Sequence, residues 1–206
     1  MNLEISIEYS DDCCDCCDCE EDSHHRCGCE YHREEKWNED EVRSTAKQCA
    51  DAVFSHLDIK SNAVEICFLF TDDETVRLLN KTYRGIDKPT NVLSFPADPI
   101  ESLDSYDNES ESDNYSDYDF KIDEENTDAP KPFLILGSMA LAHETVEREA
   151  VEQNKKFADH LRHLIVHSLL HLLNYDHTEE VDAEEMESLE IAILNKMGIS
   201  NPYELN

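Results

Sequence analysis

Hydrophobic residues recur along the chain at two spacings, and the shorter one predicts strands. Apolar and polar residues alternate from Leu3 to Tyr9, which is the period of a half-buried strand. A second alternating run covers residues 63–70, and apolar runs at residues 91–95 and 133–141 are typical of further strands. We therefore expect about four strands.

Spacings of three and four residues predict helices between and after these strands. The first helix covers about residues 40–57. A second begins after an N-cap at Thr71 or Asp72 and runs through Tyr83.

The last third of the chain is helical from about His143, with a break near Asn174 and an end near Gly198. Strands thus precede most of the helices, which favours a mixed sheet covered by helices over a doubly wound parallel sheet. We predict an α+β fold, a single compact domain over residues 1–206.

Charge divides this domain from two insertions. The 206 residues include 49 acidic and 17 basic ones, a net charge of −32, which alone predicts repulsion of nucleic acid. Residues 11–41 carry a net −10 and residues 98–128 a net −12. The segment at about 98–130 has few aliphatic residues and is rich in Ser, Asn and Tyr, so we predict a disordered acidic insertion.

The other insertion, at about residues 11–35, is acidic and rich in cysteine. It holds seven of the nine cysteines, in overlapping C-x-x-C frames without a second pair at zinc-finger spacing. A thiophilic metal site and a low-complexity segment both remain open. Disulfides are disfavoured because the acidic N-terminus does not resemble an export signal, so we expect a cytoplasmic protein.

Other classes of function are excluded by composition. There is no run of 18 or more apolar residues, so we expect no membrane span. Four glycines cannot build a P-loop or a dinucleotide fingerprint, so we expect no nucleotide cofactor.

The stretch HLRHLIVHSLLHLLNYDH, residues 160–177, contains a metal-ligand spacing. His167 and His171 lie one turn apart on one helical face, and a chain reversal at Asn174 would bring His177 back to them. Three imidazoles leave the fourth tetrahedral position of zinc open, as in catalytic sites. We predict one Zn²⁺ per chain at the end of this central helix.

Two other interpretations of these histidines compete with a zinc site. The row could be a solvated polar stripe, and we assign His160 and His163 to the surface or to a substrate groove. Metzincin proteases share the spacing but place a Glu directly after the first His, where this chain has Ser168. A metzincin-like protease is therefore disfavoured.

Three motifs resemble one family. HSLLHLLNYDH (residues 167–177) resembles the H-G-x-L-H-L-x-G-Y-D-H signature of the YbeY family of bacterial rRNA maturation factors, which are single-strand-specific endoribonucleases. LNKTYRGIDKPTNVLSFP (residues 79–96) is similar to that family's L-N-x-x-Y-R segment, and residues 136–138 are similar to its L-G-D strand. Ser138, Ser168 and Asn174 depart from the family pattern.

The resemblance implies a set of site residues. His167, His171 and His177 would be the zinc ligands, and Arg84 would be the basic residue that faces the metal across the cleft. Asn91 and Ser94 would line the cleft and contact the substrate. The clustering of basic residues between Arg77 and Lys88, rather than the resemblance, adds Lys81 and Lys88 as substrate-binding residues. Arg77, Lys155, Lys156 and Arg162 are further candidates for a phosphate track, although a solvated helix face uses the same residues.

We therefore expect a zinc-dependent, single-strand-specific endoribonuclease in rRNA maturation and ribosome quality control. Its partners would be single-stranded ribosomal RNA and the small ribosomal subunit with its proteins. RNA affinity should be weak and strongly salt-dependent. The alternative is a non-catalytic, zinc-stabilised ribosome-assembly adaptor whose acidic insertions contact basic ribosomal proteins.

Overall fold

The structure is a computed structural model, and the residues that it describes are 2–7, 37–59, 63–97, 133–175 and 180–204. Both predicted insertions, at about 11–35 and 98–130, fall outside these ranges.

One sheet has the strand order β1-β2-β4-β3, formed by β1 (Asn2–Ile7), β2 (Ala63–Thr71), β3 (Val92–Pro96) and β4 (Phe133–Ala142). β1 runs parallel to β2 and β2 runs parallel to β4, whereas β3 is antiparallel to β4 and lies at an edge. The sheet is therefore mixed, and the predicted α+β class is confirmed.

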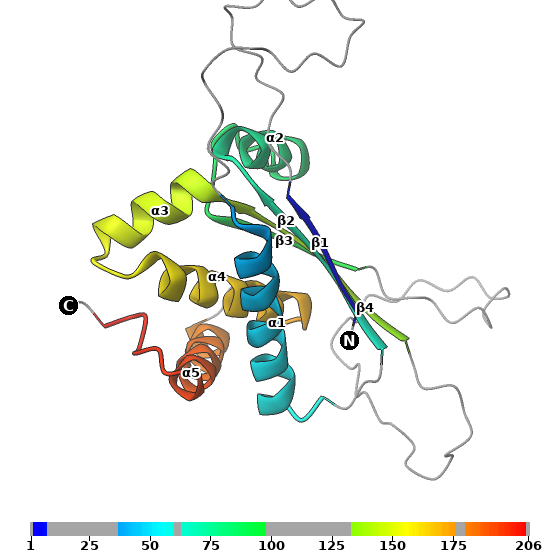
Figure 1. Ribbon diagram of the computed structural model, residues 1–206, viewed down its shortest axis with the longest axis vertical. Coiled ribbons are helices and arrows are strands. Elements are labelled where there is room, and N and C mark those ends of the chain that lie inside the picture. The colour runs from blue at the N-terminus through cyan, green and yellow to red at the C-terminus, as the bar shows by residue number, and fades with distance from the viewer. Residues whose placement is uncertain (1, 8–36, 60–62, 98–132, 176–179, 205–206) are drawn as a thin grey trace, which may run out of the picture.

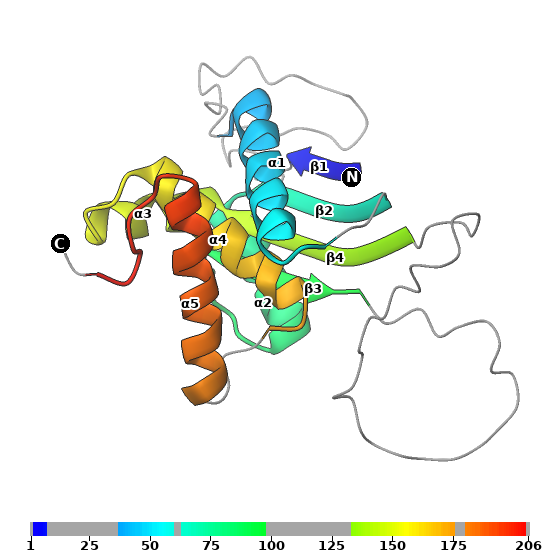
Figure 2. The same ribbon diagram turned by 90° about the horizontal axis from the view of Figure 1, so that it is seen from below.

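Helices cover both faces of this sheet (Figures 1 and 2). α1 (Glu39–His56) and α4 (Phe157–Leu172) pack on one face, and α2 (Asp73–Arg84) packs on the other. α3 (His143–Glu152) and α5 (Glu180–Lys196) contact α4, so α4 lies at the centre of the helical layer.

Side-chain alternation along the strands divides the core in two. Phe68 and Phe70 of β2 pack with Ile165 and Leu169 of α4 in the larger cluster. The opposite face holds a smaller cluster beneath α2, formed by Val76, Leu93, Ala140 and Ala142. Edge strand β3 therefore has α4 on one side and α2 on the other.

The first turns of α2 and α3 cap each other. Asp72 is the N-cap of α2, and its side chain accepts from the backbone N–H of Thr75 at 2.9 Å. The backbone N–H of Asp73 donates to the Glu144 carboxylate at 3.0 Å, and that of Thr145 donates to the Asp73 carboxylate at 2.9 Å. These bonds satisfy N–H groups that have no partner within either helix and fix the two helices relative to each other.

The predicted helical region after His143 has one more break than expected. Besides the confirmed break at Asn174, the chain leaves α3 at Gln153 and passes through Asn154, whose φ is +52°. Asparagine tolerates this left-handed conformation, and the backbone N–H of Lys155 then bonds to the carbonyl of Ala150 at 2.8 Å. The uninterrupted helix expected from 143 to 174 was therefore wrong.

Among the described residues, no helix is long and apolar enough to cross a membrane.

Gly137 allows the backbones of β3 and β4 to approach each other closely, because it has no Cβ. Its φ is +122°, and a Cβ at this position would lie 2.1 Å from the carbonyl oxygen of Phe95 in β3. No L-side chain fits such a contact, and few residues other than glycine adopt this backbone conformation. The glycine in the L-G-S stretch is thus required by the packing of the edge strand.

We predict that Gly137→Ala lowers the free energy of unfolding by about 2 kcal/mol or more, because it combines backbone strain with a clash against β3. Gly198→Ala is the matched control: Gly198 also has positive φ, at +78°, but a Cβ there meets nothing within 4 Å. It should cost only about 1–2 kcal/mol. Urea unfolding of the three proteins measures both values, and equal losses would contradict the steric argument.

Candidate metal centre

Four histidines, which we call the histidine row, follow one face of α4: His160, His163, His167 and His171. The centroids of neighbouring rings lie 6.2, 6.4 and 4.6 Å apart along the row. The rest of α4 is mostly Leu, Ile and Val buried in the larger core cluster. Core packing therefore fixes the rotation of α4 and turns the row toward α3 and α5.

Glu190 of α5 is fully buried, and three donors surround its carboxylate. Nδ1 of His167 donates to one oxygen at 2.7 Å, and Nε2 of His163 donates to the other at 2.8 Å. The hydroxyl of Tyr203 donates to that second oxygen. Burial alone would raise the pKa of Glu190, but these hydrogen bonds outweigh it and lower the pKa to about 2. The carboxylate is therefore ionised.

The bond to Glu190 fixes the tautomer of His167. An ionised carboxylate can only accept, so the proton lies on Nδ1, and Nε2 of a neutral imidazole carries the lone pair. This Nε2 lies 3.2 Å from Nε2 of His171. Two nitrogens bound at about 2.0–2.1 Å to one tetrahedral zinc ion are about 3.3 Å apart. The pair therefore fits two of the predicted zinc ligands.

The third predicted ligand, His177, lies outside the described residues. Asn174 has φ of +66° and α4 ends at Leu172, so the predicted end of the helix is confirmed. Within the described ranges, no three His, Cys, Asp or Glu side chains gather as a metal cluster. The side chain of His167 is 26% exposed, which leaves the pair accessible from the surface.

The assignment to the surface or to a substrate groove was wrong for His160, whereas the side chain of His163 is 13% exposed and faces Glu190. His160 is only 3% exposed, and its Nε2 lies 2.9 Å from the carboxylate of Glu149 in α3. Burial alone would raise the pKa of Glu149, but hydrogen bonds from His160 and Asn91 lower it. Both histidines face buried or partly buried carboxylates from distant helices, which no local pattern could indicate.

Arg84 is the last residue of α2 and its side chain is exposed. Lys88 follows on an exposed loop, and neither residue forms an ion pair within the part of the chain that is described. Lys81 differs, because its Nζ lies 2.7 Å from the Asp87 carboxylate, which also pairs with Arg77. Among the basic residues from Arg77 to Lys88, the charges without a carboxylate partner in the described ranges are thus those of Arg84 and Lys88.

Two predicted substrate-binding residues make internal hydrogen bonds. The amide of Asn91 donates to Glu149 at 3.0 Å, and its side-chain oxygen accepts from the backbone of Val92 at 2.7 Å. The hydroxyl of Ser94 lies 2.6 Å from that of Ser168, which is fully buried in α4. Ser168 therefore does not loosen the packing as a departure from glycine could have done; it joins β3 to the helix that carries His167.

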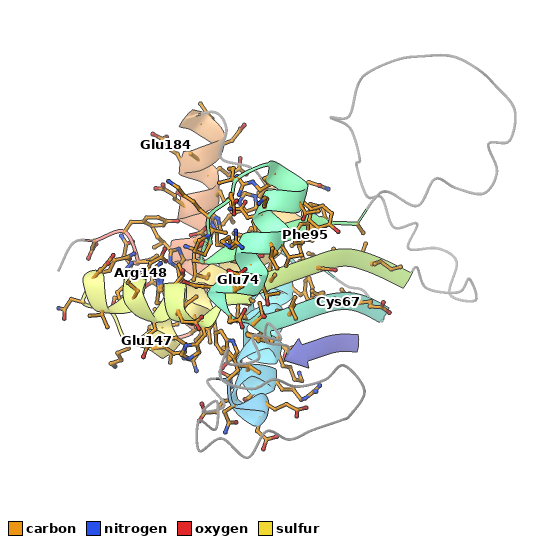
Figure 3. The ribbon with its side chains drawn as sticks, turned by 90° about the horizontal axis from the view of Figure 1, so that it is seen from above. Cys67, Glu74, Phe95, Glu147, Arg148 and Glu184 are labelled. Atoms are coloured by element: carbon orange, nitrogen blue, oxygen red, sulfur yellow. The ribbon has the colours of Figure 1, made fainter. Side chains whose placement is uncertain are left out.

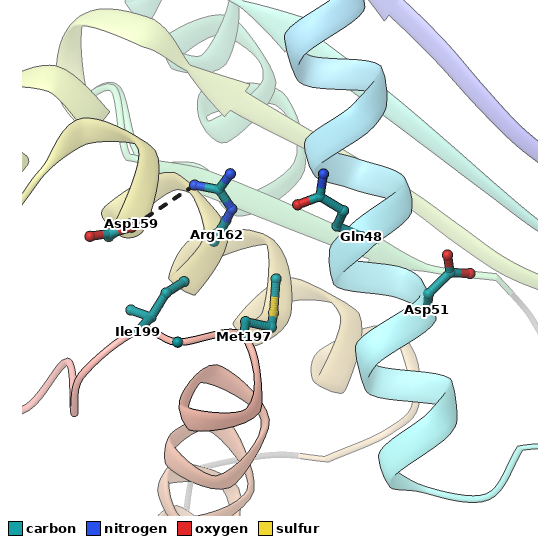
Figure 4. A pocket seen from close by; sticks show the side chains of 7 residues that line it. Gln48, Asp51, Asp159, Arg162, Met197 and Ile199 are labelled. Atoms are coloured by element: carbon teal, nitrogen blue, oxygen red, sulfur yellow. Dashed lines mark ion pairs between the residues drawn. The ribbon is translucent and has the colours of Figure 1, made fainter.

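A pocket of about 520 Å³ lies elsewhere, between α1, α4 and the segment after α5 (Figure 4). Arg162 lines it and lies 3.9 Å from Asp159, and its guanidinium donates to the carbonyl of Ala158 at 3.0 Å. Lys155, another candidate for the phosphate track, donates to the carbonyl of Pro202 at 2.6 Å. Arg162 and Lys155 are thus engaged away from the His167 and His171 pair.

Sequence reasoning missed Glu190, although a signal was present. In α5, the apolar face runs through Met186, Ile193 and Leu194, all buried, and Glu190 falls on that face at helical spacing. A lone carboxylate at a core position requires partners, and a row of histidines is the natural source of them.

Sequence comparisons with known proteins agree on one family. A family model described as Endoribonuclease YbeY matches residues 29–198. A protein named Endoribonuclease YbeY from Sinorhizobium medicae is 39% identical over 171 residues, covering 80% of this chain and 86% of that one. Its namesake from Agrobacterium fabrum is 46% identical over 140 residues, covering 68% of each. The solution structure of TM1509 from Thermotoga maritima aligns at a TM-score of 0.44 and 19% identity, covering 76% and 85%.

For the zinc site expected at His167 and His171, we predict that Glu190→Gln weakens binding about 10- to 100-fold, because Glu190 orients the imidazole of His167. The amide presents N–H groups to a site already filled by N–H and O–H donors, so His167 loses its fixed tautomer. Competition with a chromophoric chelator measures the affinity. The matched control is Glu187→Gln, an exposed position on the same helix, which should bind zinc like the unaltered chain. Equal affinities for both variants would contradict the assigned role.

Proposed function

The chain belongs to the endoribonuclease YbeY family, and we propose that it is a zinc-dependent endoribonuclease that cleaves single-stranded ribosomal RNA. The observation that carries the proposal is the distance of 3.2 Å between the Nε2 atoms of His167 and His171. The Nδ1 atom of His167 is hydrogen-bonded to the carboxylate of Glu190. Maturation of rRNA and ribosome quality control are the processes we propose for it.

In this proposal His167, His171 and His177 hold one zinc ion. Zinc at such a site lowers the pKa of water and polarises a phosphoryl oxygen. Glu190 keeps the proton of His167 on Nδ1, so that Nε2 is the ligand atom. Its ionised carboxylate also offsets part of the positive charge of the site, and its burial keeps water from competing for the hydrogen bond.

Arg84 supplies the second chemical element, a cation for the phosphoryl group. Arg84 is the last residue of α2, and its side chain is exposed. No carboxylate in the described ranges neutralises its charge. A guanidinium offers paired N–H donors to two phosphoryl oxygens and stabilises charge that develops there during cleavage. Lys88 adds a second positive charge on the following loop.

The proposed setting is the cytoplasm, on the small ribosomal subunit. The net charge of −32 opposes binding to naked RNA, and screening by salt weakens what attraction the few exposed cations supply. Basic proteins of the subunit would offset the acidic segments at about 11–35 and 98–130. Association with RNA is therefore expected to be stronger on the subunit than on isolated fragments.

We predict that the full chain with stoichiometric zinc cleaves single-stranded rRNA fragments and that chelation abolishes the cleavage. Arg84→Ala should lower kcat/KM about 10²- to 10³-fold with zinc content unchanged, because transition-state charge stabilisation is lost. His167→Ala should lose both zinc and activity. Gel-based cleavage rates and elemental analysis give the two readouts.

Arg43→Ala is the matched control. Arg43 is an exposed arginine of α1 that pairs only with Glu39 one turn away among the described residues, so its loss should not change the rate. Cleavage that survives chelation would refute the zinc proposal. A zinc-loaded chain that cuts no RNA, and that leaves the small subunit when residues 98–128 are deleted, would favour the assembly adaptor instead.

A further inference from the structure

Edge strand β3 connects the histidine row to the surface of α2. Ser94 points to α4, where its hydroxyl meets that of Ser168, the neighbour of His167. Side chains alternate along a strand, so Phe95 points to the opposite face and packs on the cluster beneath α2 (Figure 3). Strand β3 therefore contacts the helix of the candidate metal centre through Ser94 and the side chains beneath α2 through Phe95.

The ring that lies on Phe95 is Tyr83, in the last turn of α2. The two ring centroids are 5.1 Å apart with an interplanar angle of 65°, an edge contact that fixes the orientation of the tyrosine. Tyr83 is nevertheless 67% exposed, the most exposed aromatic side chain among the described residues. A large aromatic ring is thus held by a neighbour and still presented to solvent.

The basic residues before Tyr83 in the sequence are neutralised, and those after it form no ion pair among the described residues. Upstream, Arg77 and Lys81 are neutralised by Glu74 and Asp87. Hydrogen bonds from Lys81 and Arg77 lower the pKa of Asp87, so these pairs persist at neutral pH. Arg84 is adjacent to Tyr83, and Lys88 lies on the loop that follows. An exposed aromatic ring beside unneutralised cations is the composition that binds single-stranded nucleic acid.

The backbone that carries these three side chains is well ordered by local bonds. Gly85 caps α2 in the left-handed conformation, with φ of +71°, and its N–H bonds to the carbonyls of Asn80 and Lys81. The buried side chain of Asn80 donates to the carbonyl of Lys88 at 2.8 Å and so holds the loop against the helix. Ligand binding would therefore order little additional chain, which favours affinity.

We propose that Tyr83 is a stacking platform for one base of single-stranded RNA, with Arg84 and Lys88 on the flanking phosphates. This inference rests on the proposed function and adds a substrate contact to it. Stacking requires an unpaired base with an accessible π-face, so the platform selects single strands over duplex. It also gives an acidic protein an RNA contact that salt does not screen.

The experiment measures binding of a fluorescent single-stranded RNA of about ten nucleotides to the full chain by anisotropy, at two salt concentrations. Tyr83→Leu keeps an apolar contact with Phe95 but removes the aromatic face, and it should weaken binding about 5- to 100-fold. Tyr83→Phe should bind like the unaltered chain.

Leu78→Ala, an exposed apolar position on the same helix, is the matched control and should have no effect. The loss in Tyr83→Leu should be similar at both salt concentrations, whereas the loss in Lys88→Ala should shrink as salt rises.

Three results separate this inference from the proposed function. Unaltered affinity in Tyr83→Leu, with RNA binding intact in the parent chain, overturns the platform alone. Absence of RNA binding and cleavage in the parent chain overturns both. A Tyr83→Leu variant that binds naked RNA normally but no longer associates with the small subunit assigns the surface to a protein partner and overturns the platform. Thermal unfolding of each variant identifies any loss that comes from misfolding.

Discussion

A single buried carboxylate organises the candidate site. Glu190 has no exposure to solvent, so its charge is tolerable only with donors on both oxygens, and His163, His167 and Tyr203 provide them. These bonds join α4, α5 and the C-terminal segment at one point. They also decide which nitrogen of His167 is protonated. The packing of the helical layer and the geometry of the His167 and His171 pair thus depend on the same hydrogen bonds.

Edge strand β3 positions the basic end of α2 relative to the histidine pair on α4. β3 is short and antiparallel to its neighbour, and the close approach of Gly137 to Phe95 fixes its position. Because its side chains alternate, it links α4 on one face with α2 on the other. The basic end of α2 and the histidine pair are therefore positioned by one rigid element. The acidic residues that dominate the net charge lie largely in other parts of the sequence, which reconciles a charge of −32 with an RNA substrate.

Local signals in the sequence predicted most elements, and distant partners explain what was missed. Alternation and capping residues indicated the strands, the start of α2 at Asp72 and the helix end at Asn174, because these depend on neighbours in sequence. The spacing of His167 and His171 likewise follows from one helix. The burial of His160 depends on Glu149, and the internal role of Ser94 depends on Ser168, 74 residues away. Such pairings exist only in the folded chain.

We propose that the chain binds zinc and that histidines, rather than the abundant cysteines, hold the ion. X-ray absorption at the zinc edge, on the full chain loaded with one equivalent of zinc, tests it directly. Nitrogen and oxygen scatterers at about 2.0–2.1 Å, with the multiple scattering of imidazole, are the predicted result. Seven of the nine cysteines lie between residues 11 and 35, and their thiolates are the alternative ligands for such an ion. A shell of sulfur at about 2.3 Å would contradict the account.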